Sequence, residues 1–129
     1  MPHDIPELET VHEDTTPTVS GVVREGGEGS DPLPGSTLTT LEVEVYYVPA
    51  SGTPTTLYGP ISILNANNGT VDEDGNLAWT APLSVTAIQN DALKVGRHGC
   101  LFTWTWGLSP VRQGRALAWL PVRNLQVVP

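Results

Sequence analysis

The sequence predicts an all-β fold, an immunoglobulin-like antiparallel β-sandwich that follows an extended N-terminal arm. Three observations lead to this prediction. Glycine and proline supply 13 and 12 of the 129 residues, a composition that favours strands and turns over helices. Several segments alternate apolar and polar residues with a period of two, as half-buried strands do. Turn-forming residues separate these segments at intervals of about 8 to 15 residues, which is typical of a two-sheet sandwich.

The first 35 residues have the composition of an arm and not of a folded domain. They hold five prolines, a GGEG stretch at 26–29 and few large apolar side chains. Such a segment buries too little apolar surface to offset the entropy lost on ordering, and only residues 18–24 could form a short strand. We therefore expect residues 1–35 to be held by another molecule, most simply a neighbouring subunit, and residues 36–129 to form the sandwich.

Alternation and turn signals place the strands of that sandwich. They predict strands at residues 37–48, 56–64, 70–71, 76–80, 98–106 and 115–127. The side chains expected to face the core are Leu41, Val43, Val45, Tyr47, Leu77, Trp79, Cys100, Phe102, Trp104 and Trp106. Because proline cannot donate to a sheet, Gly59–Pro60 predicts a bulge or an edge position for the second strand.

The segments between the strands read as turns and loops. The DEDGN sequence at 72–76 predicts a hairpin turn with Gly75 at a positive φ. Residues 49–54, 65–69 and 108–114 are expected to be loops. Residues 81–93 are the one stretch where a helical turn is expected, with Val85, Ile88 and Leu93 toward the core.

The charge distribution bears on partners. The formal net charge is −8, made of −7 over residues 1–35, −6 over 36–91 and +5 over 92–129. A nucleic-acid binder normally carries net positive charge, since neutralising phosphates supplies most of its affinity. We expect no direct binding to DNA or RNA.

No run of about 18 apolar residues is present, so no membrane span is expected, and the N-terminus does not have the pattern of a secretory signal.

Two groups of residues have the chemistry of metal ligands or nucleophiles. Asp72, Asp74 and Asn76 alternate as calcium ligands can, but Leu83 stands where an EF-hand has its bidentate glutamate. An acidic hairpin turn that caps its own backbone is the favoured interpretation. His98 and Cys100 share one strand face at a separation of about 6–7 Å, too far for a nucleophile and its base. Cys100 is expected to pack as a small apolar residue.

Other sites give no sign of an enzyme. The chain contains no nucleophile elbow, P-loop, dinucleotide fingerprint or zinc-protease motif. We therefore predict no enzymatic activity, no cofactor and no metal. The four tryptophans, Trp79, Trp104, Trp106 and Trp119, are expected to be shared between core and interface, and a carbohydrate-stacking platform is the alternative.

Charged residues supply the candidate partner contacts. The arm carries the acids Asp4, Glu7, Glu9, Glu13 and Asp14, and Arg112 and Arg115 flank Gly114 in the predicted exposed turn. Ordinary solvated charge is one interpretation. The functional one pairs these bases with the acidic arm of another copy, or with an acidic partner, where complementary charge fixes register.

The C-terminal half also carries a longer pattern. The hairpin GTVDEDGNLAW is followed by a proline-containing corner, the strand HGCLFTWTW and a terminal strand that closes with PVRNLQVVP. In this pattern residues 70–129 resemble small accessory structural proteins of tailed bacteriophages. The resemblance implies an immunoglobulin-like or related β-sandwich and a place on the capsid or in the neck and tail. It brings no catalytic residue and does not extend to residues 1–35.

Together these observations predict a non-enzymatic virion protein that is made in the host cytoplasm. The expected role is capsid decoration, in which many copies bind the major capsid protein through the sandwich and the arm. The alternatives are a neck or tail component that forms a ring, and a module that binds carbohydrate or a host surface.

Overall fold

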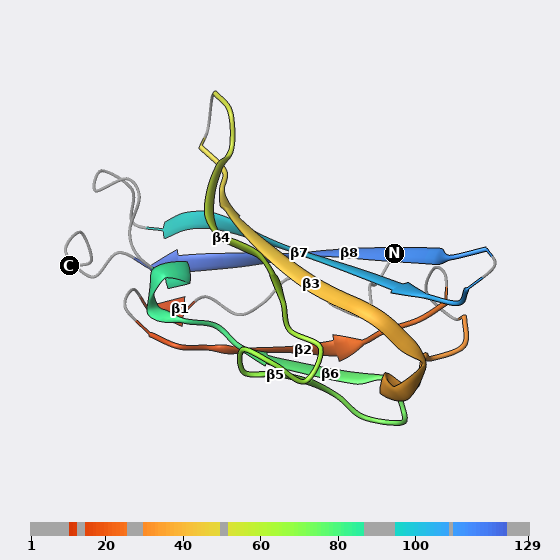
Figure 1. Cartoon of the computed structure of the whole chain (residues 1–129). Helices are drawn as coiled ribbons and strands as arrows, with labels where there is room; N and C mark the ends of the chain where they lie inside the picture. Colours follow the sequence, from red (N-terminus) through yellow and green to blue (C-terminus); the bar gives the residue numbers. More distant parts are fainter. Residues whose placement is uncertain are drawn as a thin grey trace.

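The structure is a computed structural model that describes residues 11–12, 15–25, 30–49, 52–86, 95–108 and 110–123. Two β-sheets face each other in two layers (Figure 1). The larger sheet has the strand order β1-β8-β7-β3-β4, and the smaller sheet has the order β2-β6-β5. The predicted all-β sandwich is confirmed at this level.

The larger sheet is built from four long strands and one short one. They are β1 (Val11–His12), β3 (Leu38–Tyr47), β4 (Thr55–Ser62), β7 (Val95–Trp106) and β8 (Arg112–Arg123). β1 pairs with the end of β8 in parallel, and the other neighbours are antiparallel. β4, which contains Gly59–Pro60, lies at the edge, and its pairing with β3 shifts register between Val43 and Tyr46. The predicted edge position of this proline is confirmed.

The smaller sheet and two short helices complete the described fold. The strands of the smaller sheet are β2 (Thr18–Val22), β5 (Gly69–Val71) and β6 (Asn76–Thr80). The 3₁₀ turn η1 (Gly35–Thr37) precedes β3, and η2 (Leu83–Thr86) follows β6. Within the described part of the chain, neither helix is long and apolar enough to cross a membrane.

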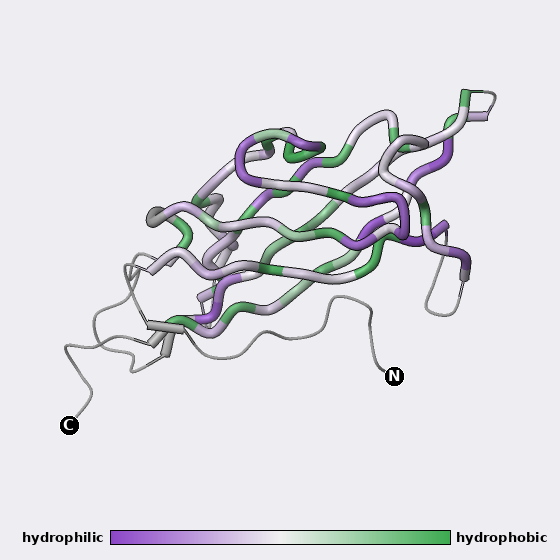
Figure 2. The backbone as a smooth tube through the Cα atoms, turned by 90° about the horizontal axis from the view of Figure 1, so that it is seen from below, coloured by the Kyte–Doolittle hydropathy of each residue, from purple (hydrophilic) through white to green (hydrophobic). Residues whose placement is uncertain are grey.

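The core lies between the two sheets, where the alternating residues of the strands meet. Figure 2 shows green hydrophobic positions recurring along the strands, as expected for strands with one buried face. Trp79 on β6 is fully buried, with its ring edge-on to Phe102 at 6.1 Å and stacked on Tyr58 at 6.0 Å between centroids. Of the ten strand residues predicted to face the core, nine are buried, and the tenth, Tyr47, is partly exposed and packs edge-on against His98.

The prediction that residues 1–35 stand apart from the sandwich is wrong for the described parts of that segment. β2 pairs along its whole length with β6. Val19 and Val23 are fully buried, and Leu33 is nearly so. The segment is poor in apolar residues, but these three occupy core positions, and pairing satisfies the backbone. Residues 15–25 and 30–35 therefore belong to the sandwich and need no neighbouring subunit to hold them, while residues 1–10, 13–14 and 26–29 lie outside the described residues.

The last two strands are longer at their N-terminal ends than predicted. β7 begins at Val95, and β8 begins at Arg112, inside the predicted loop 108–114. The predicted loop ended at Gly114, yet Gly114 lies directly opposite Trp104 in the sheet. A Cβ at Gly114 would come within 2.4 Å of the Trp104 indole nitrogen. Glycine is therefore needed here for close packing inside a strand, not for a turn. The predicted helical turn over 81–93 is η2 in its described part, and Ile88 and Leu93 lie outside that part.

Candidate functional site

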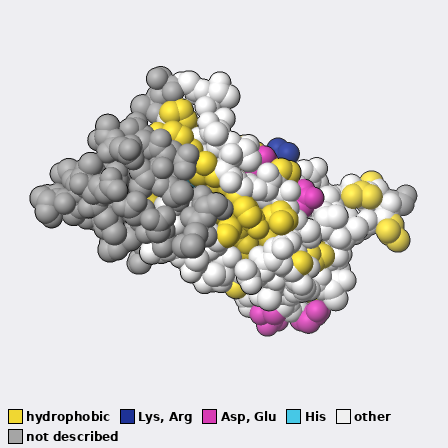
Figure 3. Space-filling model, turned by 60° about the vertical axis from the view of Figure 1, so that its left-hand side comes forward, with side chains coloured by type: hydrophobic (Ala, Val, Ile, Leu, Met, Phe, Trp, Pro, Cys, Tyr) yellow, Lys and Arg dark blue, Asp and Glu magenta, His cyan; other side chains and the backbone are white. Residues whose placement is uncertain are grey.

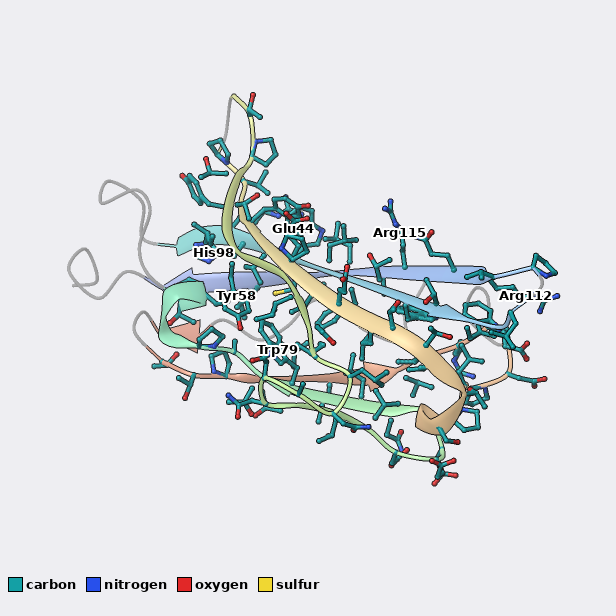
Figure 4. All side chains as sticks on the ribbon, in the orientation of Figure 1. Glu44, Tyr58, Trp79, His98, Arg112 and Arg115 are labelled. Atoms are coloured by element: carbon teal, nitrogen blue, oxygen red, sulfur yellow. The ribbon has the colours of Figure 1, made fainter. Side chains whose placement is uncertain are left out.

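The predicted partner-binding residues fall into two groups. The acids Asp4, Glu7, Glu9, Glu13 and Asp14 lie outside the described residues. Arg112 and Arg115 lie on β8 and not in an exposed turn as predicted. The Arg112 guanidinium is 3.7 Å from the Glu25 carboxylate of the same chain, an exposed pair of small energetic value. Arg115 is exposed and projects from the outer side of the larger sheet (Figure 4).

The acidic hairpin is a self-capped turn. One carboxylate oxygen of Asp72 accepts hydrogen bonds from the backbone N–H groups of Asp74 and Asn76, both at 2.9 Å. The other oxygen accepts from the Asn76 side-chain amide at 3.0 Å. These hydrogen bonds lower the pKa of Asp72, and Gly75 has a φ of +83°. The turn interpretation of this segment is confirmed, and no group of three or more potential metal ligands occurs among the described residues.

His98 and Cys100 are both buried on the inner face of β7. Burial raises the pKa of the Cys100 thiol to about 12, so this cysteine packs as an apolar residue, as predicted. His98 Nδ1 lies 2.6 Å from the carbonyl oxygen of Val85 in η2, and its Nε2 has no hydrogen-bond partner among the described residues. Figure 4 shows His98 near η2, at one end of the sandwich. The contact joins η2 to β7, and the His98 imidazole is fully buried.

The tryptophans divide unequally between core and surface. Trp79, Trp104 and Trp106 are buried, and the Trp104 indole N–H donates to the carbonyl oxygen of Arg24 at 3.0 Å. Trp119 on β8 is partly exposed and points to the outer face. The three buried indoles cannot form a stacking platform for a sugar, because such a platform requires exposed ring faces.

An apolar hollow lies on the outer face of the larger sheet, the face turned away from the core. It has a volume of about 270 Å³ and is lined by Tyr46, Val48, Pro54, Gly99, Leu101, Leu117 and Trp119. We call these seven residues the outer-face site. Leu117 is 44% exposed. A cluster of large apolar side chains on a solvent-facing sheet surface is what a contact with another molecule would bury.

Strand register orders the side chains of this face into rows that cross β3, β7 and β8. One row is Tyr46, Gly99 and Trp119, the next is Glu44, Leu101 and Leu117, and the third is Glu42, Thr103 and Arg115. Paired residues project to the same side of a sheet. Their alternation with the buried residues of the same strands places all nine on the outer face.

Glycine and charged residues shape the hollow. Gly99 leaves its floor open, since a Cβ there would contact Trp119 at 3.2 Å and Leu117 at 3.5 Å. The Arg97 guanidinium lies 3.9 Å from the centre of the Trp119 ring, which is a cation–π contact. The Tyr46 hydroxyl donates to the Glu44 carboxylate, and Thr56 donates to the same carboxylate at 3.4 Å.

Charged side chains beside the hollow affect the pKa of Tyr46. The hydrogen bond to Glu44 is the main cause that raises the pKa of Tyr46, with burial and the Glu44 charge adding to it, while the charge of Arg115 lowers it. Along the upper edge of Figure 3, basic and acidic side chains lie beside hydrophobic ones. The apolar outer-face site is therefore bordered by charged side chains, which we call its rim. Many protein–protein contact surfaces have this composition.

Sequence reasoning did not single out this site, although the sequence carries a signal for it. Residues 116–120 read ALAWL, so apolar side chains occupy both faces of this part of β8. A strand with one solvated face should alternate strictly. The break in alternation indicates a second buried or contacting surface.

No protein-family model matches this chain, and neither a curated protein nor a solved structure matches it at a significant level. These comparisons do not support the resemblance to phage accessory proteins.

Proposed function

We propose that this chain is a non-enzymatic structural protein that binds other proteins, and that the outer-face site is its contact surface. The observation that carries the proposal is the apolar centre made by Leu101, Leu117 and Trp119 on a sheet face that would otherwise be polar. Burying such side chains against a partner is favourable by about 25 cal/mol per Å² of apolar surface. The charged rim would add orientation to that contact.

We further propose that the sandwich is immunoglobulin-like. In immunoglobulin domains strands B, E and D are neighbours in one sheet, and G, F, C and, in the variable type, C′ are neighbours in the other. When β2 to β8 are labelled B, C, C′, D, E, F and G in chain order, the observed strand orders become B-E-D and C′-C-F-G. This correspondence supports the proposal independently of any sequence similarity.

For the biological setting we propose a bacteriophage virion, with capsid decoration as the role, and with the major capsid protein and other copies of this chain as the partners. This part of the proposal is supported by the sequence pattern of residues 70–129 alone. A neck or tail ring is the second candidate, because a sandwich with one apolar outer face could also pack side by side around an axis. The acids of residues 1–14 and Arg115 remain the proposed charged contacts.

Site-specific cross-linking tests the contact surface. A photoreactive residue at position 117 should cross-link to a partner in assembled particles, and mass spectrometry should identify the cross-linked peptide. The matched control places the same residue at Ser20, which is exposed on β2 in the other sheet. Equal cross-linking at the two positions, or none at 117, would contradict the outer-face site as the contact surface.

Copy number tests the setting. Capsid decoration requires many copies per purified particle, and a neck ring requires only the few that one ring holds. Absence of the protein from purified particles would remove the virion proposal and leave the contact-surface proposal to stand on the cross-linking result.

A further inference from the structure

We infer that the partner at the outer-face site is a second copy of this chain, packed face to face about a twofold axis that runs parallel to β7. The inference rests on the proposed function, because it takes the outer face to be a contact surface. It adds the identity and the orientation of the partner.

The inference starts from the asymmetry of the rows. In the third row Glu42 lies on β3 and Arg115 on β8, with Thr103 of β7 between them. In the first row Tyr46 lies on β3 and Trp119 on β8, with Gly99 between them. These two rows thus have complementary groups at their ends, separated by two strand spacings, or about 10 Å. At that separation the ends of a row do not contact each other within one copy.

A twofold axis parallel to β7 brings these ends together between copies. With such an axis, β3 of one copy lies over β8 of the other. Each row of one copy lies over the same row of the other copy. Face-to-face sheets pack about 10 Å apart with their strands within about 30° of parallel. Glu42 of each copy then faces Arg115 of the other, Tyr46 faces Trp119, and Leu101 meets its own counterpart near the axis.

The charges of the third row favour this arrangement. Glu42 and Arg115 are exposed, and no ion pair joins either to another described residue. Glu44, by contrast, already accepts hydrogen bonds from Tyr46 and Thr56. Glu44 can therefore be covered without losing its partners, while Glu42 and Arg115 would gain one each. Because each copy uses the same surface to bind the other, the contact forms a dimer and does not extend to a third copy.

The hollow also suits a copy of the same face. Gly99 lies at the centre of its row and has no side chain of its own, and because the axis keeps the rows level, Gly99 of one copy faces Gly99 of the other. The Tyr46 and Trp119 side chains of both copies then lie around the space that the two glycines leave. Leu101 and Leu117 lie one row away. The apolar side chains of two such faces can interdigitate, as the inner faces of packed sheets do.

Charge reversal in the full-length protein tests the inference by sedimentation velocity. The wild-type chain should form a dimer. Glu42→Arg and Arg115→Glu should each weaken it about tenfold or more, because two like-charge contacts per dimer replace two attractive ones. An equimolar mixture of the two variants should recover a dimer that holds one copy of each. In that mixed dimer the two substituted side chains face each other with opposite charges, and the native pair is kept on the other side of the axis.

The controls separate this inference from the proposed function. Arg112→Glu makes the same charge change on β8 outside the three rows, and it should leave dimerisation unchanged. A monomeric wild type, a dimer that survives both reversals, or a mixture that stays monomeric would each overturn the inference. If one of these results accompanies cross-linking of position 117 to a different protein, the proposed function stands and only the identity of the partner is wrong.

Discussion

At the scale of single residues, burial decides the protonation state of His98. The side chain is fully buried, and the titratable group that faces it is Tyr47 of β3, whose ring lies edge-on at 5.9 Å. The neighbours from the other described elements, Val85 in η2 and Leu120 on β8, carry no charge. Burial lowers the pKa of His98, although the contact with the Val85 carbonyl opposes the shift. At pH 7 His98 is therefore mainly neutral in the folded protein.

This burial predicts an acid-dependent loss of stability. The unfolded chain binds a proton at His98 near the ordinary histidine pKa of 6.5, whereas the folded chain binds it only at lower pH. The contribution of His98 to stability is complete above that pH and is lost as the pH falls through the lower, folded pKa. Urea unfolding followed from about pH 7.5 to pH 5 should show the midpoint falling. In His98→Asn the fall should be smaller, and an equal pH dependence in both proteins would contradict the assignment.

Two glycines on neighbouring strands give a matched pair of substitutions. In Gly114→Ala the new methyl group would lie 2.4 Å from the Trp104 indole nitrogen on the inner face, and overpacking of this kind costs about 1–3 kcal/mol. In Gly99→Ala the methyl group meets Trp119 at 3.2 Å, but Trp119 is partly exposed and can move. We expect Gly114→Ala to lower the free energy of unfolding clearly more than Gly99→Ala. Equal losses in chemical denaturation would show that the Trp104 contact is not rigid.

At the scale of elements, β2 decides whether the N-terminal segment is part of the fold. Val19 on β2 is fully buried, and its neighbour Ser20 is exposed. Val19→Ala should lower the free energy of unfolding by about 1–3 kcal/mol, because it removes buried methyl groups and leaves a cavity. Ser20→Ala should stay within about 0.5 kcal/mol of the wild type. A neutral Val19→Ala would mean that β2 does not contribute to the stability of the sandwich.

The contrast between β3 and β2 also explains how far the sequence predicts this fold. β3 and β6 alternate so clearly that their faces follow from the residues alone, and the Asp72 turn has its own local hydrogen bonds. β2 holds only a few apolar residues, and its order comes from pairing with β6, which no local pattern reveals. Arg112 and Gly114 have the composition of a turn, yet the Trp104 side chain on the next strand requires a glycine there. Tertiary packing overrides composition at both places.

The outer-face site was beyond local reasoning for a related reason. Tyr46, Gly99 and Trp119 are far apart in the sequence and form one row only through the register of three strands. The run from Ala116 to Leu120 signals that β8 is apolar on both faces, but it does not say which residues of other strands lie beside it. Residue types can indicate such a surface, and strand order is needed to assemble it.

At the scale of the whole molecule, the distribution of indoles predicts a simple optical signature. Trp79, Trp104 and Trp106 are buried, and Trp119 is partly exposed. Acrylamide should therefore quench a minor part of the native fluorescence, and Trp119→Phe should remove most of that part. Quenching should also decrease as the protein concentration rises, because face-to-face pairing covers Trp119. Strong quenching that persists in Trp119→Phe would contradict the burial of the other three indoles.

The hydrogen bond from the Trp104 indole to the carbonyl of Arg24 joins positions 80 residues apart, and β2 finds its strand partner only in residues 76–80. Protein synthesis runs from one end to the other, so the segment that contains β2 leaves the ribosome long before β6, β7 and β8 exist. Pairing across such long separations is slow, since the chain must lose the entropy of loop closure before the strand pairing can stabilise it. A nascent chain therefore carries Val19 and Val23 uncovered until β6 and the strands that follow it have been made.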